Sequence, residues 1–381
     1  MPVRRVAVMM SGGSGYFASV MRGISHYAIA HGPWEFVTQV PGLSVIAVRE
    51  WEVDGIIVPL RSAEYARLFR ERGIPTVNCS GVLQDSGLPT VHVDDRVAGQ
   101  MAAAHLLELG FTRFGYCGYP DFRFAHVRGE GFTEILRERG FEVVFHQPDP
   151  ALRLEWTWDR QEEDLARWLK TLDRPIAIMA CNDERAWQLA EASRRVGIRV
   201  PEEVALIGVD NDELRCEFST PPLSAVAVPA ERIGYESAAM LDRLMEGGPV
   251  DLTPVLVRPR GIVARRSTDV LAFDDEAVVK AFRFIRDNLA TPFGPDDVVR
   301  EVGNGGQALD DKFRHRFGRS LEDEIMRARV QRAERILAET DLEVPQVARA
   351  TGFRTATSFT AMFRRQTGLT PRAYREKFRV R

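Results

Sequence analysis

Residues 355–366 predict an amphipathic helix whose outer face has the chemistry to contact DNA. Phe359 and Phe363, four positions apart, predict its buried face. Hydroxyl groups near a helix start can approach base edges, and arginines further along can bind phosphates. The face opposite the two phenylalanines carries both kinds of side chain, namely Thr357, Ser358, Arg364 and Arg365.

The segment before this helix completes a helix-turn-helix pattern. Val344–Ala350 predicts a short helix, and Thr351-Gly352-Phe353 predicts a tight turn. In such motifs the second helix enters the major groove. Arg354 and Thr355, where the second helix begins, join the predicted DNA contacts.

The charge of the C-terminal end is compatible with a polyanionic partner. The last 33 residues carry nine basic side chains and one acid, Glu376, although the whole chain has a net charge of −3. Such a local excess is typical of nucleic-acid binding. A solubilising basic tail would look the same, so charge alone leaves both interpretations open.

Several positions of the C-terminal part resemble the signature of AraC-family DNA-binding domains: Gly352-Phe353, Phe359, Phe363, Gly368-Leu369-Thr370-Pro371 and Tyr374-Arg375. The resemblance covers about 100 residues and implies two helix-turn-helix motifs joined by a long helix. The connecting helix would be Leu321–Glu339, and the first motif would comprise Pro295–Val302 and Gly306–Phe317. Gln307 and Lys312 are the DNA contacts expected from the first motif.

The first motif departs from the family pattern. Gly305 and Gly306 weaken the start of its second helix. Asp310 and Asp311 would repel phosphates, although an acid can accept a hydrogen bond from cytosine N4. In the second motif, Ala361 stands where an arginine is common. An alternative therefore stays open. In it, the chain is a cytoplasmic sugar-binding protein whose DNA-binding domain, called the reader below, is degenerate and has no sequence-specific DNA binding.

The first 270 residues alternate strand-like and helix-like segments. This alternation predicts βαβ units and parallel sheets with helices on both faces, and the number of strands favours two α/β lobes. Small ligands bind such folds between the lobes or at the carboxyl ends of their strands. The ten strand candidates are 3–10, 35–40, 55–59, 76–79, 90–93, 114–118, 142–145, 177–181, 204–209 and 223–228.

Five short runs in this half resemble the ligand-binding domain of the LacI family, which is itself similar to periplasmic sugar-binding proteins. They occur in the family's order: Val91-His92-Val93-Asp94-Asp95, Arg128-Gly129-Glu130-Gly131-Phe132, Ala180-Cys181-Asn182-Asp183, Ile207-Gly208-Val209-Asp210-Asn211 and Pro222-Leu223-Ser224. The resemblance spans about residues 4 to 265. It implies that Arg128, Asn182 and Asp210 contact sugar hydroxyls. A guanidinium, an amide and a carboxylate suit vicinal hydroxyls, although Asn182 and Asp210 could instead cap the helices that follow them.

Three further residues are candidates for the same ligand site. Asp94 and Asp95 precede a predicted helix, so helix capping explains either of them as well as sugar binding does. Tyr16 follows the glycine-rich run Ser11-Gly12-Gly13-Ser14-Gly15, which should line the cleft. Tyr16, Tyr119, Phe122, Phe124 and Trp158 are candidates for stacking on a sugar, and core packing explains each of them equally well.

The order of the two parts, sensor before reader, resembles the family of bacterial xylose-operon regulators, as does the junction run Arg265-Arg266-Ser267-Thr268-Asp269. This resemblance predicts a two-lobed sensor domain over residues 1–268 and an all-α double helix-turn-helix domain over residues 269–381. It implies a pentose effector, D-xylose in the first place, a homodimer and DNA as partner. Activation is the commoner outcome with AraC-type readers, and RNA polymerase is then a candidate partner.

Other classes of function have little support in the sequence. The run Ser11–Gly15 lacks the lysine of a phosphate-binding loop, and neither a metal-binding H-E-x-x-H nor a G-x-S-x-G pattern occurs. The four cysteines are at least 35 positions apart and form no zinc pattern. No apolar run approaches the roughly 20 residues that span a bilayer. We therefore expect a cytoplasmic protein with no catalytic residue, metal, cofactor or membrane partner.

Overall fold

The computed structural model describes residues 3–10, 15–38, 52–83, 85–148, 158–270, 272, 275–303 and 306–378. The chain forms two compact units, Met1–Val270 and Leu271–Arg381. Residues 11–14 of the glycine-rich run, and Gly305, lie outside the described residues.

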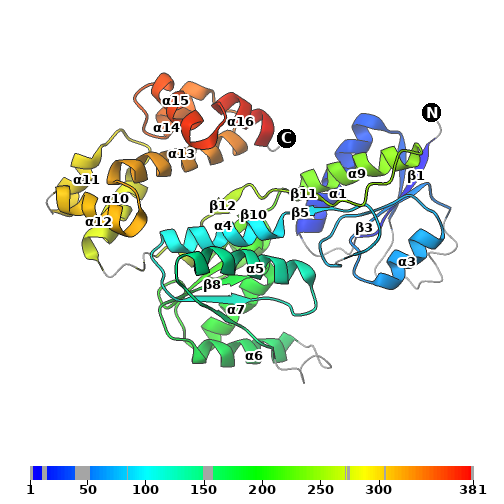
Figure 1. The fold of residues 1–381 in the computed structure, drawn as a ribbon, viewed down its shortest axis with the longest axis horizontal. Coiled ribbons are helices and arrows are strands. Elements are labelled where there is room, and N and C mark those ends of the chain that lie inside the picture. Colours follow the sequence, from blue (N-terminus) through cyan, green and yellow to red (C-terminus); the bar gives the residue numbers. More distant parts are fainter. Residues whose placement is uncertain are drawn as a thin grey trace. The chain divides into compact units, whose positions relative to one another are not determined.

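The first lobe of the N-terminal unit is a parallel four-stranded sheet in the order β2-β1-β3-β4. Its strands are β1 (Arg4–Val8), β2 (Trp34–Thr38), β3 (Gly55–Val58) and β4 (Thr76–Asn78). Three helices belong to this lobe: α1 (Gly15–His31), α3 (Ala63–Glu71) and α9 (Ala230–Met245). Ile56 and Val58 of β3 pack against Ala66 and Phe69 of α3. Figure 1 shows α1 and α9 side by side in this lobe.

The second lobe is a six-stranded sheet in the order β12-β10-β9-β8-β6-β7, parallel except for the β10–β12 pair. The central strands are apolar and fully buried over residues 176–180 and 204–209, as parallel strands covered by helices on both faces require. The strands are β6 (Phe114–Cys117), β7 (Val143–Phe145), β8 (Ile176–Ala180), β9 (Val204–Asp210), β10 (Ser224–Ala227) and β12 (Gly261–Val263). The helices are α4 (Asp95–Glu108), α5 (Arg123–Glu138), α6 (Trp158–Thr171), α7 (Asp183–Arg195) and α8 (Glu213–Phe218).

The two lobes are joined where the chain passes from one sheet to the other. β5 (Val91–Val93) pairs in parallel with β11 (Val255–Val257), and β5 leads into α4 while β11 leads into β12. A third connection runs from β10 into α9. All ten strands expected from the sequence are present, so the prediction of a two-lobed α/β unit is confirmed. β11 and β12, three residues each, were not predicted.

The C-terminal unit is helical and has two adjoining cores. Leu309, Phe313 and Leu321 belong to the core of the first motif, and Val347 and Phe359 belong to that of the second. The long helix α13 contributes to both cores along its length. The helices are α10 (Glu276–Asn288), α11 (Pro295–Val302), α12 (Gly306–Phe317), α13 (Leu321–Glu339), α14 (Val344–Ala350), α15 (Ala356–Thr367) and α16 (Pro371–Phe378), drawn in yellow to red in Figure 1.

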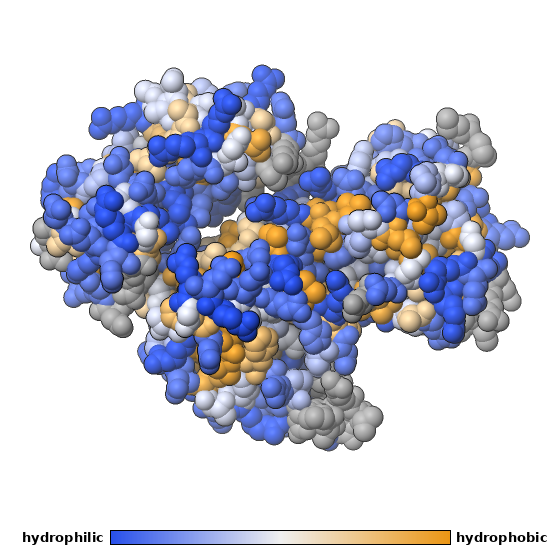
Figure 2. Space-filling model, viewed as in Figure 1, coloured by the Kyte–Doolittle hydropathy of each residue, from blue (hydrophilic) through white to orange (hydrophobic). Residues whose placement is uncertain are grey.

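The surfaces of the two units differ in polarity. In the view of Figure 2, apolar residues gather on the N-terminal unit, whereas the visible face of the C-terminal unit is mostly hydrophilic. The exposed apolar side chains of the N-terminal unit include Ile29, Leu214, Phe218, Val250, Leu252 and Leu256. None of the described helices is both long and apolar enough to cross a membrane.

Candidate functional sites

The candidate ligand site is built on two helices whose backbones touch. A Cβ atom on Gly99 of α4 would lie 2.0 Å from the carbonyl oxygen of Arg128, and one on Gly131 of α5 would lie 2.1 Å from that of Arg96. Only glycine permits so close an approach. As a result Asp95, the first residue of α4, lies beside Arg128 of α5, and Arg128 Nε donates to Asp95 Oδ1 at 2.8 Å.

Arg128 also contacts the ends of two strands. Its Nη1 donates to the carbonyl oxygen of Cys181 at 2.5 Å and lies 3.5 Å from Asp210 Oδ1. The guanidinium lies 4.9 Å from the ring centre of Phe124 and is buried. The structure therefore brings Arg128, Asp95 and Asp210 together, with the cation between the two carboxylates.

Acceptors in this site outnumber the donors that reach them. Asp95 Oδ2 is buried, and among the described residues no donor reaches it within hydrogen-bond distance. His92 Nδ1 lies 3.5 Å away but bonds to the carbonyl oxygen of Val93 at 2.7 Å. An unpaired buried acceptor is costly, and a hydroxyl is a donor that would satisfy it.

Asp210 occupies an unusual backbone conformation at the end of β9. Asp210 and Asn211 have positive φ angles of 114° and 58°, a strained arrangement that is common at functional sites. Burial raises the pKa of Asp210 to about 6, while the charge of Arg128 opposes this shift. Arg265 Nη2 holds the turn by donating to Asn211 Oδ1 at 2.9 Å.

Tyr16 belongs to the first lobe but lies in the electrostatic field of the second. Burial, followed by the nearby Cys79, Asp210 and Asp95, raises the pKa of Tyr16 well above its usual value. Tyr16 is the second residue of α1, and the preceding Gly15 donates its N–H to Asp212 of the second lobe, so the start of this helix lies against that lobe. The structure therefore adds Tyr16 to the group around Arg128.

Asn182 and Asp94 both act as helix caps. Asn182 Oδ1 accepts from the backbone N–H of Arg185 at 2.9 Å and begins α7, which leaves its amide N–H group available for a ligand. Asp94 Oδ1 accepts from the N–H of Val97 at 3.1 Å and begins α4. Among the described residues, no contact joins Asp94 to Arg128 or Asp210, so capping accounts for Asp94.

The second helix-turn-helix motif presents its predicted contacts on one face. Gly352 turns the chain with φ 71° between α14 and α15, and Phe359 and Phe363 are fully buried. Thr355 caps α15 by accepting from the N–H of Ser358 at 3.1 Å. The predicted DNA contacts of this motif are all exposed, namely Arg354, Thr355, Thr357, Ser358, Arg364 and Arg365.

In the first motif, several charged side chains of α12 bind other parts of the unit. Lys312 Nζ lies 2.6 Å from Asp275 Oδ2, at the start of α10, so this predicted DNA contact is engaged within the protein. Asp310 accepts from the N–H of Leu321 at 2.8 Å and pairs with Arg314 at 2.7 Å. Gln307 and Asp311 are exposed.

A buried arginine of α13 joins the two motifs. Arg329 Nη2 donates to the carbonyl oxygens of Thr291 and Phe293 at 3.2 and 3.0 Å. Its guanidinium also lies 4.7 Å from the ring centre of Phe293 and 5.8 Å from that of Phe353. Arg329 thus fixes the loop before the first motif against the turn of the second.

Comparisons with known proteins match both units. Residues 103–268 match the periplasmic binding protein-like domain family, and residues 298–377 match a helix-turn-helix domain family. The xylose operon regulatory protein of Escherichia coli (strain K12) is 27% identical over 382 residues, which cover 98% of this chain and 97% of that protein. The protein of the same name from Haemophilus influenzae is 26% identical over 380 residues, covering 97% and 98%. The solved structure of a xylose-binding transcription activator matches 100% of both chains, with 26% identity and a TM-score of 0.63.

The chain is a periplasmic-binding-protein-like sensor fused to an AraC-type helix-turn-helix reader. It has the architecture of a sugar-responsive transcription regulator. LacI family regulators from Mycobacterium smegmatis and Enterococcus faecalis share the fold of the sensor, each at 22% identity, with TM-scores of 0.59 and 0.57 over 70% and 71% of this chain.

Two acidic residues of the regulator's sensor were not expected at the site. Asp212 Oδ2 accepts from the N–H of Gly15, in the first lobe, at 2.9 Å. Asp183 is buried and accepts from the N–H of Asp212 at 2.7 Å. Burial, and then the charge of Asp210, raises the pKa of Asp183. The only signals in the sequence were that Asp183 ends the run Ala180–Asp183 and that Asp212 directly follows the run Ile207–Asn211.

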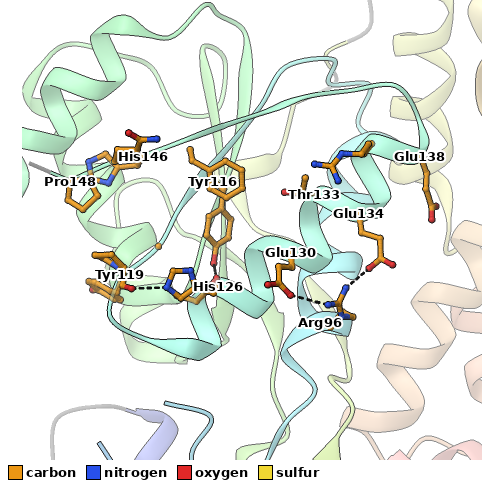
Figure 3. Close-up of a pocket in the computed structure, with 16 residues that line it drawn as sticks. Arg96, Tyr116, Tyr119, His126, Glu130, Thr133, Glu134, Glu138, His146 and Pro148 are labelled. Atoms are coloured by element: carbon orange, nitrogen blue, oxygen red, sulfur yellow. Dashed lines mark hydrogen bonds and ion pairs between the residues drawn. The ribbon is translucent and has the colours of Figure 1, made fainter. Parts of the chain in front are cut away.

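The sensor of this regulator also contains a cavity of about 1040 Å³ that is separate from the candidate ligand site. Figure 3 shows it beside α5, with Tyr116, Tyr119, His126 and His146 on one side and Glu134 on the other. Arg96 pairs there with Glu130 and Glu134, at 3.0 Å each. None of the six predicted sugar-binding residues lines it. Tyr119 lies here, 5.0 Å from the guanidinium of Arg185, rather than beside Arg128. Among the described residues, no group of His, Cys, Asp or Glu side chains is arranged to hold a metal ion.

Proposed function

We propose that this regulator binds a sugar between the lobes of its sensor through Arg128, Asp95, Asp210, Asn182 and Tyr16. The observation that carries the proposal is Arg128 held between the buried Asp95, which has an oxygen without a donor, and the half-buried Asp210. Sugar hydroxyls supply donors for the carboxylates and acceptors for the guanidinium. A pentose, with D-xylose first, is the proposed effector, because two relatives of nearly full-length coverage are named as xylose operon regulators.

The reader binds operator DNA through the exposed face of α15 and, more weakly, through α12. Sugar closes the two lobes, and closure changes how the two readers of a homodimer are spaced on DNA. A ligand shifts such an equilibrium only if it has different affinities for the two states. The apolar side chains exposed on the sensor support self-association. We propose activation in the cytoplasm, with RNA polymerase as a further partner and no catalytic step.

The effector is tested by thermal unfolding in the presence of a panel of pentoses and hexoses. Ligand at one hundred times its Kd stabilises the folded state by about 2.7 kcal/mol, so D-xylose should raise the Tm clearly. A rise in Tm with a hexose and with no pentose would mean that the effector is that hexose and not D-xylose. The absence of any shift with every sugar of the panel would remove the sugar-sensor half of the proposal.

DNA binding is tested separately, by gel shift on the region upstream of the protein's own gene, with and without the effector. Retardation that depends on sequence supports a regulator. A protein that binds sugar but no DNA would instead be a sugar-binding protein with a degenerate reader. Equal affinity and equal footprints with and without a tightly bound sugar would exclude the coupling between the two units.

A further inference from the structure

The two recognition helices can be compared position by position inside this one chain. In α15 the buried pair is Phe359 and Phe363, and in α12 it is Leu309 and Phe313, again four residues apart and fully buried. Because α-helical side chains repeat every 3.6 residues, the residue midway between each pair points directly away from the core. That residue is Ala361 in α15 and Asp311 in α12, and both are exposed.

The charges around these two central positions differ. On α15, Arg364 and Arg365 are exposed, and Arg365 is near enough to Asp323 to help lower the pKa of that carboxyl. Counting from the buried pair, the matching residues of α12 are Arg314, which is paired with Asp310 at 2.7 Å, and His315. The second helix therefore offers exposed arginines to phosphates, Arg364 first, whereas on α12 the arginine that corresponds to Arg364 is already paired with Asp310.

The central carboxylate of α12 restricts what that helix can contact. Asp311 can only accept hydrogen bonds when ionised and is repelled by phosphate oxygens. Among the base edges of the major groove, a carboxylate suits the N4 amino group of cytosine. Asp310 does not compete for this role, because it holds the start of α13 through the N–H of Leu321.

We propose that Asp311 is the specificity-determining residue of the first motif and selects a cytosine in the operator, while the second motif supplies the phosphate contacts. The inference rests on the proposed DNA-binding function of the reader. The two motifs are then unequal: α15 sets most of the affinity, and α12 sets the identity of one base pair.

The test is selection of random-sequence DNA duplexes by the full-length protein, followed by sequencing, for the wild type, Asp311→Asn and Glu301→Gln. Asparagine pairs with adenine through N6 and N7, so Asp311→Asn should replace the selected cytosine by adenine at one position. The change in preference should be roughly 5- to 150-fold. Glu301 is an exposed acid of α11, so Glu301→Gln removes the same charge and should leave every base preference unchanged.

The outcomes separate this inference from the function on which it rests. A single position that changes in Asp311→Asn and not in Glu301→Gln supports it. If the wild type and Asp311→Asn select the same operator, Asp311 reads no base and the inference is wrong. A wild-type protein that enriches no sequence, with or without D-xylose, would overturn the DNA-binding function itself.

Discussion

Asp212 of the second lobe accepts a hydrogen bond of 2.9 Å, through Oδ2, from the backbone N–H of Gly15 in the first lobe. Gly15 is the first residue of α1, where the helix dipole favours a negative charge. Oδ1 of the same carboxylate caps α8 by accepting from the N–H of Arg215 at 3.4 Å. One side chain therefore joins the turn beside Asp210 to the start of α1 in the first lobe.

Replacing Asp212 should weaken ligand binding without unfolding the sensor. Asn caps helices as well as Asp does, so Asp212→Asn keeps α8 but loses the charge at the start of α1. Hydrogen bonds to charged groups contribute about 1.5–3 kcal/mol, and we expect a loss of sugar affinity of that order by calorimetry. Gly15→Ala should act in the same direction, because its Cβ would lie 2.7 Å from the Asp212 carboxylate. Unchanged affinity in both variants would mean that the bond has no part in closure.

Removing Arg128 should destabilise the sensor even in the absence of a ligand. Arg128→Met leaves the buried Asp95 and the half-buried Asp210 without their shared cation, and breaking a buried pair costs roughly 3–5 kcal/mol. The double variant Arg128→Met/Asp95→Asn should recover part of this loss, because one buried charge disappears. Urea unfolding monitored by circular dichroism measures both. Equal stability of the single and double variants would contradict the charge balance described here.

The stability of the ligand-free sensor should fall as the pH rises from about 4 to about 6. The folded pKa of Asp210 is about 6, above the value near 3.9 of an unfolded chain. The folded protein therefore binds the proton more tightly, and this stabilisation is lost as the pH rises through the folded pKa, by at most about 3 kcal/mol. Asp183, whose pKa is also raised, acts in the same sense. Unfolding of Asp210→Asn should depend less on pH, and Glu217→Gln, at an exposed carboxylate of α8, is the control.

Arg329 should be needed to hold the two helix-turn-helix motifs of the reader in a fixed arrangement. Arg329→Met loses the bonds to the carbonyl oxygens of Thr291 and Phe293, which should cost roughly 2–3 kcal/mol. DNA affinity should fall with it, because the two recognition helices are no longer held in register. Arg335 is exposed on the same helix, so Arg335→Met should change neither quantity. A stable Arg329→Met protein with full DNA affinity would show that the contacts are dispensable.

The salt dependence of DNA binding should distinguish the arginines of the two motifs. Removing a side chain that binds one phosphate lowers the slope of log K against log salt by about 1. We expect this change for Arg364→Ala and for Arg365→Ala. Arg314→Ala should leave the slope unchanged, because Asp310 already neutralises that side chain. Gel shifts at several salt concentrations measure these slopes. A reduced slope for Arg314→Ala would contradict the proposal that the second motif, and not the first, supplies the phosphate contacts.

The fold was largely predictable because its strands are apolar runs between amphipathic helices. The fully buried strand Ile176–Ala180 is an example that periodicity finds without any structure. The strands Val255–Val257 and Gly261–Val263 were not predicted, since three residues are too few to show a hydrophobic pattern. Their pairing depends instead on β5 and β10, which are distant in the sequence.

The candidate sites were predictable only where a motif marks them. Arg128 and Asp210 lie in motif runs, and the structure brings them together. Sequence alone did not reveal the ion pair of Lys312 with Asp275, because it depends on how α10 packs against α12. For Asn182 both interpretations persist, since one end of its amide caps α7 while the other is available for a ligand.

The contacts of Arg329 with the loop before the first motif and the turn of the second also restrict the spacing of DNA subsites in a genome. α13 has 19 residues and so extends over about 28 Å, somewhat less than the 34–36 Å helical repeat of DNA. Because α13 and its arginine hold the two motifs at a fixed separation, each protein copy should require its two subsites at one constant spacing. One inserted base pair would turn the second subsite by roughly a tenth of a helical turn. Natural binding sites should therefore vary in sequence far more freely than in the distance between their two parts.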